Sequence, residues 1–264
     1  MEAMNTHPEP TPSLFADRLT MRFGGLVAVN DFSLTLRPGE LVALIGPNGA
    51  GKTTAFNMLT GVYRPTEGSI QLAGKPVTGR KPHEICGLGM ARTFQNIRLF
   101  KEMTVLDNVK VAFHQRCEQG LLDAVLRTQK FDEEERHQEN EAHRLLKVFA
   151  LDRLAGELAK NLPYGDQRRL EIVRAMATRP HILLLDEPAA GMNPQETLGL
   201  MELIRHIRDA FSLTILLIEH HMNLVMGISE RILVLDHGTT IATGTPKEIQ
   251  ADPKVIQAYL GKAD

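Results

Sequence analysis

The sequence predicts an α/β fold in which helices cover a mainly parallel sheet. Two short, continuous apolar runs, residues 182–185 and 215–218, have the composition of parallel strands buried on both faces, and each follows a longer segment of helical spacing. The chain has 264 residues, enough for one large α/β domain with or without an inserted subdomain. A glycine-rich stretch behind a third apolar run, residues 41–45, narrows the class to the P-loop NTPases.

That stretch has the GxxxxGKT pattern of a phosphate-binding loop. It consists of Gly46, Pro47, Asn48, Gly49, Ala50, Gly51, Lys52, Thr53 and Thr54. We expect its glycines to adopt backbone angles closed to other residues, so that successive amides turn toward phosphate oxygens. Lys52 then reaches the terminal phosphates, and the Thr53 hydroxyl binds Mg²⁺. A tight turn that binds nothing is disfavoured by the full pattern between a strand and a helix.

Before and after this loop, short strand-like segments alternate with turn residues. They predict a small antiparallel β-layer that leads into the loop, followed by a helix whose N-terminus faces phosphate. The expected strands are 14–21, 32–36, 41–45 and 69–72, with turns at 24–25 and 37–39, and the expected helix is 52–59.

The middle of the chain, from about residue 106 to 158, changes to helical spacing and predicts a helical subdomain. Its acidic and histidine-rich stretch, 132–143, suits a solvated helix face better than a metal site. An α/β rhythm then returns and ends in two short helices. The expected elements are helices 167–178 and 195–210, strands 181–186, 214–219 and 231–235, and the closing helices within 244–261.

Two adjacent carboxylates end one of the apolar strands. Asp186 and Glu187 would be costly at that position unless a cation or water uses them, so the segment is typical of a Walker B strand. Asp186 would help hold Mg²⁺, and Glu187 would polarise the water that attacks the γ-phosphate. Gln95 and His220 follow other strands, where their side chains could converge on the same point. His220 is chosen over its neighbour His221.

Composition excludes some other classes. With 30 basic and 32 acidic side chains the formal charge is −2, which does not indicate a nucleic-acid or anionic-membrane binder. The apolar runs are far shorter than the roughly 18 residues of a spanning helix. Residues 1–12 contain no apolar stretch of signal-peptide length and are expected to be a flexible leader.

In this order and spacing, the phosphate loop, Gln95, the segment 161–169, Asp186-Glu187 and His220 resemble ABC transporter ATPase subunits, over residues 13–261. The resemblance implies a single domain, 13–264. A RecA-like core and antiparallel β-layer would come from 13–95 and 170–264, and an inserted helical subdomain from 96–169. It also implies Mg²⁺ and a head-to-tail dimer that holds two ATP molecules at its interface.

Carried over by position, Phe23 resembles the aromatic residue that stacks on adenine. Gln95 resembles the Q-loop residue that reaches Mg²⁺ and links the site to the transporter, and His220 the switch histidine. The signature segment would meet the partner subunit's nucleotide. Its residues, with the D-loop residue, are Leu162, Tyr164, Gly165, Asp166, Gln167 and Asn193.

Two positions depart from the family pattern. Pro163 stands where a serine hydroxyl usually contacts the γ-phosphate across the dimer, and Asn193 stands where the D-loop usually ends in aspartate. Because proline has neither hydroxyl nor N–H, we hypothesise that Pro163 lowers ATP-driven dimer affinity. A higher ATP-driven dimer affinity of a Pro163→Ser variant, measured by sedimentation, would support this, and an unchanged affinity would contradict it.

Within the family, residues 23–25, 92–95, 164–172, 189–194 and 258–261 resemble the ATP-binding subunit of branched-chain amino acid importers. The resemblance implies a membrane permease, a second ATPase subunit, an external binding protein reached indirectly, and a place on the cytoplasmic face of the membrane. Urea, amide or other amino acid import and lipopolysaccharide export are alternatives. A soluble ABC protein that binds nucleic acid is disfavoured by the single cassette and near-neutral charge. A regulatory module without turnover conflicts with Glu187 and His220.

Overall fold

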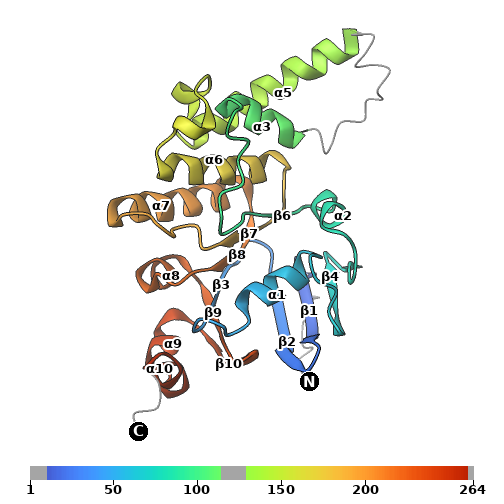
Figure 1. Ribbon diagram of the computed structural model, residues 1–264, viewed down its shortest axis with the longest axis vertical. Helices are drawn as coiled ribbons and strands as arrows, with labels where there is room; N and C mark the ends of the chain where they lie inside the picture. Colours follow the sequence, from blue (N-terminus) through green and yellow to red (C-terminus); the bar gives the residue numbers. More distant parts are fainter. Residues whose placement is uncertain (1–10, 114–128, 261–264) are drawn as a thin grey trace, which may run out of the picture.

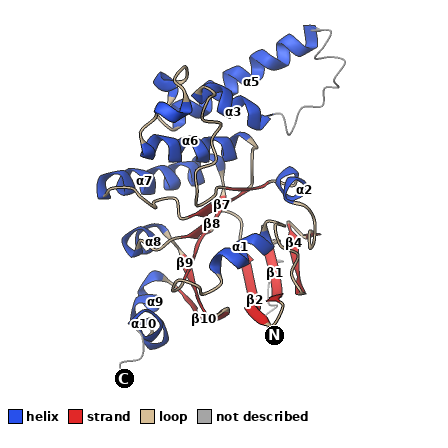
Figure 2. Cartoon of the chain, viewed as in Figure 1, coloured by secondary structure: helices blue, strands red, loops and turns tan. Residues whose placement is uncertain are grey.

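A computed structural model of the chain describes residues 11–113 and 129–260. These residues form two sheets and a set of helices, arranged as in Figures 1 and 2. The strands are β1 (Leu14–Phe23), β2 (Leu26–Leu36), β3 (Leu41–Ile45), β4 (Glu67–Leu72), β5 (Lys75–Pro76), β6 (Met90–Arg92), β7 (Ile182–Asp186), β8 (Thr214–Ile218), β9 (Arg231–Asp236) and β10 (Thr239–Gly244). The helices are α1 (Lys52–Leu59), α2 (Pro82–Gly87), α3 (Val105–Phe113), α5 (Gln129–Val148), α6 (Tyr164–Ala177), α7 (Pro194–Phe211), α8 (Met222–Ile228), α9 (Pro246–Ala251) and α10 (Pro253–Leu260), with 3₁₀ turns at Asp152–Leu154 and Ala159–Asn161.

The central sheet has six strands in the order β10-β9-β3-β8-β7-β6. Only β10 runs antiparallel to its neighbour; the other pairs are parallel. Every residue of β3, β7 and β8 is buried, which explains why these strands are continuous apolar runs. Ile218 pairs with both Leu44 and Asp186, so the loops that follow these three strands leave the sheet at one edge.

A four-stranded antiparallel sheet, β2-β1-β4-β5, covers one face together with α1. The predicted β-layer is therefore confirmed, and the turn between its first two strands lies at Gly24 and Gly25. Phe32 from β2 and Phe56 from α1 are fully buried against apolar side chains of the central sheet.

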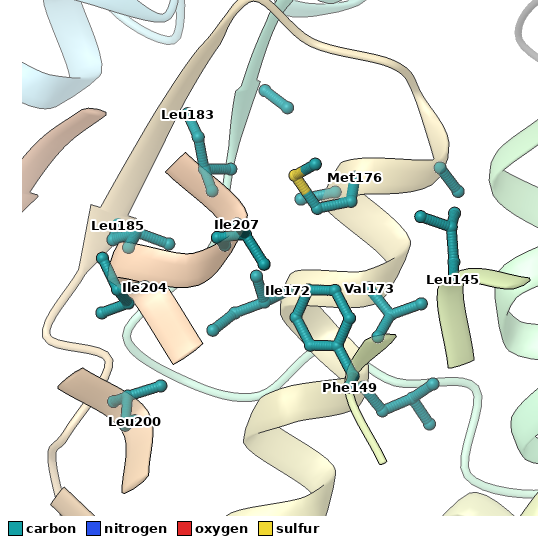
Figure 3. Packing of buried hydrophobic residues seen from close by; sticks show 14 of the residues in the cluster. Leu145, Phe149, Ile172, Val173, Met176, Leu183, Leu185, Leu200, Ile204 and Ile207 are labelled. Carbon is teal, nitrogen blue, oxygen red and sulfur yellow. The ribbon is translucent and has the colours of Figure 1, made fainter. Parts of the chain in front are cut away.

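Helices α3, α5, α6 and α7 lie beyond the opposite face of the central sheet (Figure 1). In Figure 3, Ile204 from α7 lies beside Leu185 of β7, and Ile172 from α6 belongs to the same buried cluster. Phe149, just after α5, packs in the same cluster. The helix α6 thus lies between the central sheet and the helices α3 and α5, because it also packs against both of these helices.

Most predicted elements are present, with shifted ends. The helix 52–59 and the strand 41–45 have the predicted bounds. β2 begins at Leu26 instead of residue 32, and α6 begins at Tyr164 instead of residue 167. The expected boundary between residues 169 and 170 lies inside α6. The expected leader is almost wholly outside the described residues, as are 114–128 of the expected helical region.

Three findings concern the end of the chain, metal-ligating side chains and the length of the helices. The closing pair of short helices is confirmed as α9 and α10. Within 11–113 and 129–260, no group of three or more histidine, cysteine, aspartate or glutamate side chains is placed to hold a metal ion. No described helix is both long and apolar enough to cross a membrane.

Candidate functional site

The phosphate loop joins β3 to α1 at the shared edge of the central sheet. Gly46, Gly49 and Gly51 all have positive φ, at 153°, 79° and 99°. A Cβ atom on Gly46 would lie 2.0 Å from the Leu235 carbonyl oxygen, and one on Gly51 would lie 2.6 Å from the carbonyl oxygen of Ala28. Glycine is therefore required at Gly46 and Gly51 both by backbone angle and by space.

Lys52 begins α1 and turns back into the loop. Its Nζ atom donates hydrogen bonds to the carbonyl oxygens of Gly46 and Pro47, at 2.7 and 2.8 Å. Burial lowers the pKa of the lysine below its ordinary value, although the charges of Glu187 and Asp186 oppose that shift. An ammonium group held in this position can bind phosphate with its remaining donor.

A cavity of about 480 Å³ opens beside the loop. It brings together, from distant parts of the chain, three side chains that the sequence placed at separate strand ends: Gln95, Glu187 and His220. Its lining residues are Leu26, Val27, Ala28, Asn48, Gly49, Ala50, Gly51, Lys52, Thr53, Thr54, Gln95, Glu187, His220 and His237.

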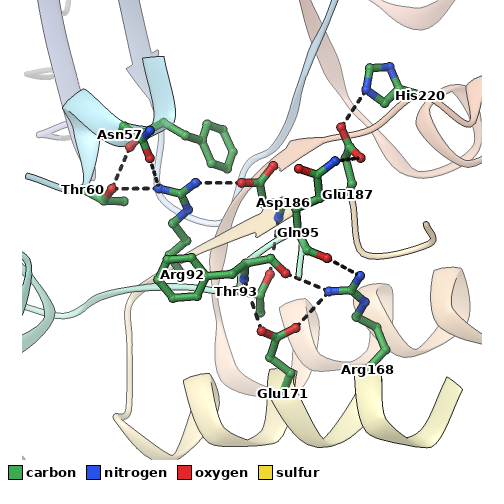
Figure 4. A network of polar contacts seen from close by, with 12 residues as sticks. Asn57, Thr60, Arg92, Thr93, Gln95, Arg168, Glu171, Asp186, Glu187 and His220 are labelled. Atoms are coloured by element: carbon green, nitrogen blue, oxygen red, sulfur yellow. Dashed lines mark hydrogen bonds and ion pairs between the residues drawn. The ribbon is translucent and has the colours of Figure 1, made fainter. Parts of the chain in front are cut away.

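Glu187 lies between the other two side chains (Figure 4). Gln95 Nε2 donates to Glu187 Oε2 at 2.7 Å, and His220 Nε2 lies 2.7 Å from Glu187 Oε1. Because a carboxylate only accepts hydrogen bonds, the imidazole donates its Nε2 proton here. Glu187 has φ 47°, an uncommon angle for a residue other than glycine, and its N–H donates to Ile218 O. Strained backbone of this kind recurs at functional sites.

Asp186 is fixed by a partner that the sequence reasoning missed. Arg92, the last residue of β6, donates from Nη2 to Asp186 Oδ2 at 2.7 Å, and both side chains are buried. Arg92 also donates to Asn57 of α1 and to Thr60, the C-cap residue of that helix (Figure 4). Asp186 is not among the residues that line the cavity, and no described residue donates to its Oδ1 atom. A charged residue ending a buried apolar strand was the available signal for Arg92.

Glu219 was also missed as a structural residue of the site. It is 1% exposed, and its carboxylate accepts backbone N–H bonds from Ala189, His220 and His221 at 2.8, 2.9 and 3.2 Å. One buried carboxylate thus joins the loop after Glu187 to the turn that carries His220. A carboxylate directly after the apolar strand 214–218 was the available signal in the sequence.

Phe23 lies at the end of β1, half-exposed, and its ring contacts Tyr63 edge to face at 5.3 Å between ring centroids. It is not among the residues that line the cavity; Leu26, Val27 and Ala28 of β2 line it instead. These three residues were not identified from the sequence, because the early part of β2 was not recognised as a strand. His237, directly after β9, was not identified either.

The signature segment lies apart from this cavity, whose described lining includes none of its residues. Leu162 and Gly165 are buried, whereas Tyr164 is exposed and a Cβ on Gly191 would lie 3.2 Å from its ring. Pro163 is the N-cap residue of α6, and its carbonyl oxygen accepts from the amides of Asp166 and Gln167.

Asn193, the other departure from the family pattern, is the N-cap of α7. Its side chain accepts from the Glu196 amide at 2.9 Å, and the Glu196 carboxylate accepts from the Asn193 amide at the same distance. This capping box holds the side-chain acceptor of Asn193 within its own helix.

Two family models match the chain. The model described as ABC transporter matches residues 29–190, and the model described as branched-chain amino acid ATP-binding cassette transporter matches residues 239–264.

Curated relatives and solved structures resemble it over nearly its full length. The high-affinity branched-chain amino acid transport ATP-binding protein LivG of Salmonella typhimurium is 54% identical, over 96% of this chain and 99% of that protein. BraF of Pseudomonas aeruginosa, with the same description, is 50% identical over the same shares. The lipopolysaccharide export system ATP-binding protein LptB of Acidithiobacillus ferridurans is 37% identical, over 94% of this chain and 96% of that protein. The solved ADP conformation of MJ1267, an ATP-binding cassette of an ABC transporter, has a TM-score of 0.82 and 30% identity, over 95% and 99% of the two chains.

Proposed function

The chain belongs to the ATP-binding proteins of the ABC transporter family, and we propose that it energises the uptake of branched-chain amino acids through a membrane permease. As a member of this family it is an ATPase. The observation that carries the choice of substrate is the 50–54% identity to curated branched-chain amino acid transport proteins along almost the whole chain. The lipopolysaccharide export relative is more distant, at 37%.

We propose that Glu187 is the group that activates water. Its two oxygens are bonded to Gln95 and His220, which holds the carboxylate at the mouth of the phosphate loop. A water bound to Glu187 could be aligned with the γ-phosphate there, and His220 could donate to a phosphate oxygen as charge develops. Lys52 would neutralise charge on the same phosphate.

Thr53, Gln95 and Asp186 are the proposed Mg²⁺ ligands. Their hydroxyl, amide and carboxylate oxygens are the hard donors that this ion prefers. Arg92 donates to Oδ2 of Asp186 and Gln95 donates from its amide nitrogen to Glu187, so the other side-chain oxygen of Asp186 and the amide oxygen of Gln95 are the atoms proposed to bind the ion. When bound, Mg²⁺ would supply positive charge to the β- and γ-phosphate oxygens.

The permease is proposed to dock in a second cavity, of about 620 Å³, whose lining includes Phe94, the residue before Gln95. Apolar residues of β6, α2, α3 and the segment between β6 and α3 line it, among them Phe94, Phe100 and Ala112. Phe94 is adjacent to Gln95, so a segment bound in this cavity would touch the residue next to one that contacts Glu187. A peripheral position on the cytoplasmic face of the membrane, a second ATPase subunit, and an external binding protein belong to the same proposal.

The test is uptake of labelled leucine by cells whose chromosomal gene carries Lys52→Ala. We expect high-affinity uptake to be lost, because the terminal phosphates lose their cation. Lys75→Ala is the matched control: Lys75 is an exposed lysine of β5 outside the cavity, and its loss is expected to leave uptake unchanged. If Lys52→Ala abolishes ATP hydrolysis by the assembled transporter but leucine uptake persists, the substrate is wrong. If hydrolysis also persists, the site assignment is wrong.

A further inference from the structure

A buried ion pair on α6 is used neither for phosphate nor for metal. Arg168 and Glu171 lie three residues apart on this helix, with side chains 0% and 5% exposed, and Arg168 Nη1 donates to Glu171 Oε2 at 3.0 Å. Burying two charges is costly, and apolar residues of similar volume often give equal or greater stability. Their contacts with a neighbouring segment therefore indicate what the pair does.

Both members of the pair bind the backbone of the segment that carries Gln95 (Figure 4). Arg168 donates from Nη1 to the Phe94 carbonyl oxygen at 2.8 Å and from Nη2 to the Gln95 carbonyl oxygen at 2.7 Å. Glu171 Oε1 accepts from the amides of Phe94 and Arg98, at 3.4 and 3.3 Å. One ion pair thus contacts both ends of the segment 94–98.

Arg168 also contacts the signature segment at the start of α6. Arg168 Nη2 also donates to the Tyr164 hydroxyl at 3.1 Å, and its guanidinium lies 5.8 Å from the Tyr164 ring centroid. Tyr164 and Gly165 form the first turn of α6. Burial raises the pKa of Glu171 above its ordinary value, although Arg168 and the amides of Arg98 and Phe94 oppose that shift.

We propose that Arg168 and Glu171 are positioning residues that make the segment 94–98 and the first turn of α6 move as one unit. Movement of Gln95 at one nucleotide site would then shift Tyr164 and Gly165, which face the partner subunit's nucleotide in the proposed dimer. The pair would thereby couple the two ATP sites of the dimer. This inference rests on the proposed function, because it requires ATP to bind at the phosphate loop.

A pair that only stabilised the fold would make a different prediction. Removing it would lower stability, but nucleotide would still alter the two segments together. The discriminating quantity is therefore the response of each segment to nucleotide, not the stability of the protein. A two-state element biased from two sites is the physical requirement for coupling of this kind.

The experiment is amide hydrogen exchange on the full chain, with and without Mg²⁺ and a non-hydrolysable ATP analogue. Three regions are followed: the phosphate loop, residues 94–98 and residues 164–168. In the unmodified chain, nucleotide should slow exchange in all three. In Arg168→Met with Glu171→Leu, which keeps the side-chain volume, the phosphate loop should still respond and residues 164–168 should not. The Phe94 and Arg98 amides should exchange about tenfold faster, since they lose their acceptor.

Arg168→Lys is a second variant, which keeps the positive charge and provides a test if the double variant does not fold. One ammonium cannot reproduce the planar fork that reaches Glu171 and two carbonyl oxygens, so partial uncoupling is expected. The control is Glu40→Leu with Arg231→Met, which removes a partly buried pair joined at 2.7 Å between β9 and the start of β3. It should lower stability without changing the nucleotide response.

The possible outcomes distinguish failure of the coupling from failure of the proposed function. A double variant in which residues 164–168 still respond to nucleotide as in the unmodified chain overturns the coupling. A lack of response there in the unmodified chain, with the phosphate loop protected, also overturns it. If the phosphate loop itself is not protected, the proposed function fails instead.

Discussion

Replacing Arg92 with methionine should strongly destabilise the protein. The arginine side chain is 8% exposed, and its partner Asp186 is 4% exposed. The substitution removes hydrogen bonds of 2.7 Å to Asp186, 2.7 Å to Asn57 and 3.2 Å to Thr60. It leaves Asp186 as a buried charge without its counter-ion, for which a loss of about 3–5 kcal/mol is typical.

The flanking rings of Phe56 and Phe94 add to this loss. The Arg92 guanidinium lies 5.6 and 5.2 Å from their centroids, and each such contact contributes roughly 0.5–1 kcal/mol. Methionine retains part of the packing, so we keep the estimate for Arg92→Met at about 3–5 kcal/mol. For a chain of this size, that corresponds to a melting temperature lower by roughly 5–9 °C.

The assay is thermal unfolding followed by circular dichroism, for Arg92→Met, Asp186→Asn and the double variant. Asp186→Asn in the Arg92→Met background should cost less than in the unmodified chain, because the orphaned charge is gone; an interaction energy above about 1 kcal/mol is expected. Arg208→Met is the control, since its pair with Glu230 is more exposed and should contribute under about 1 kcal/mol. Strict additivity, or a loss for Arg92→Met no larger than in the control, would refute the reasoning.

Three further predictions concern other parts of the fold. Glu219→Gln replaces a carboxylate that accepts three backbone N–H bonds with an amide that has one acceptor oxygen. Stability should fall by about 1–3 kcal/mol, and kcat for ATP should also fall because His220 loses its fixed position; an unaltered kcat would contradict the positioning role. Although burial raises the pKa of Glu40, the hydrogen bond and charge of Arg231 with the Arg37 amide bring it below 4.5. Between the folded pKa of Glu40 and 4.5, the unfolded chain therefore binds more protons than the folded chain, so the stabilisation by Glu40 is complete above pH 4.5 and is lost as pH falls through the folded pKa. The stability difference between Arg231→Met and the unmodified chain should shrink over that range, and a constant difference in urea unfolding across pH would contradict the prediction. Ile204→Ala empties a fully buried position of α7 and should cost about 2–5 kcal/mol in urea unfolding with KM for ATP unchanged; a raised KM would show that the helix reaches the site.

The parts of the fold that could be predicted are those in which local pattern and tertiary position agree. β3, β7 and β8 are buried on both faces, so their sequences are continuously apolar and easily recognised. The first half of β2 was not recognised because its residues are mostly exposed and Asp31, at φ 54°, interrupts the strand pattern. The start of α6 was placed late because Pro163 and Gly165 suggest a break, whereas Pro163 is the N-cap.

The candidate site divides in the same way. The phosphate loop and the Asp186-Glu187 pair carry their chemistry in adjacent residues, so sequence alone identifies them. Gln95 and His220 were placed by resemblance, and the structure brings both onto Glu187. The bonds from Arg92 to Asp186 and from Arg168 to the carbonyl oxygens of residues 94 and 95 could not be predicted, because these groups lie 94 and 73–74 residues apart and no local pattern specifies that they meet.

The two hydrogen bonds from Lys52 to its own loop have a consequence for the thermodynamics of nucleotide binding. A free lysine side chain loses up to about 2 kcal/mol of rotamer entropy when it is immobilised. Here the Gly46 and Pro47 carbonyl oxygens hold the ammonium at the centre of the loop, so that entropy is lost when the chain folds. A phosphate group therefore meets a side chain that is already ordered, and more of the interaction energy appears as affinity.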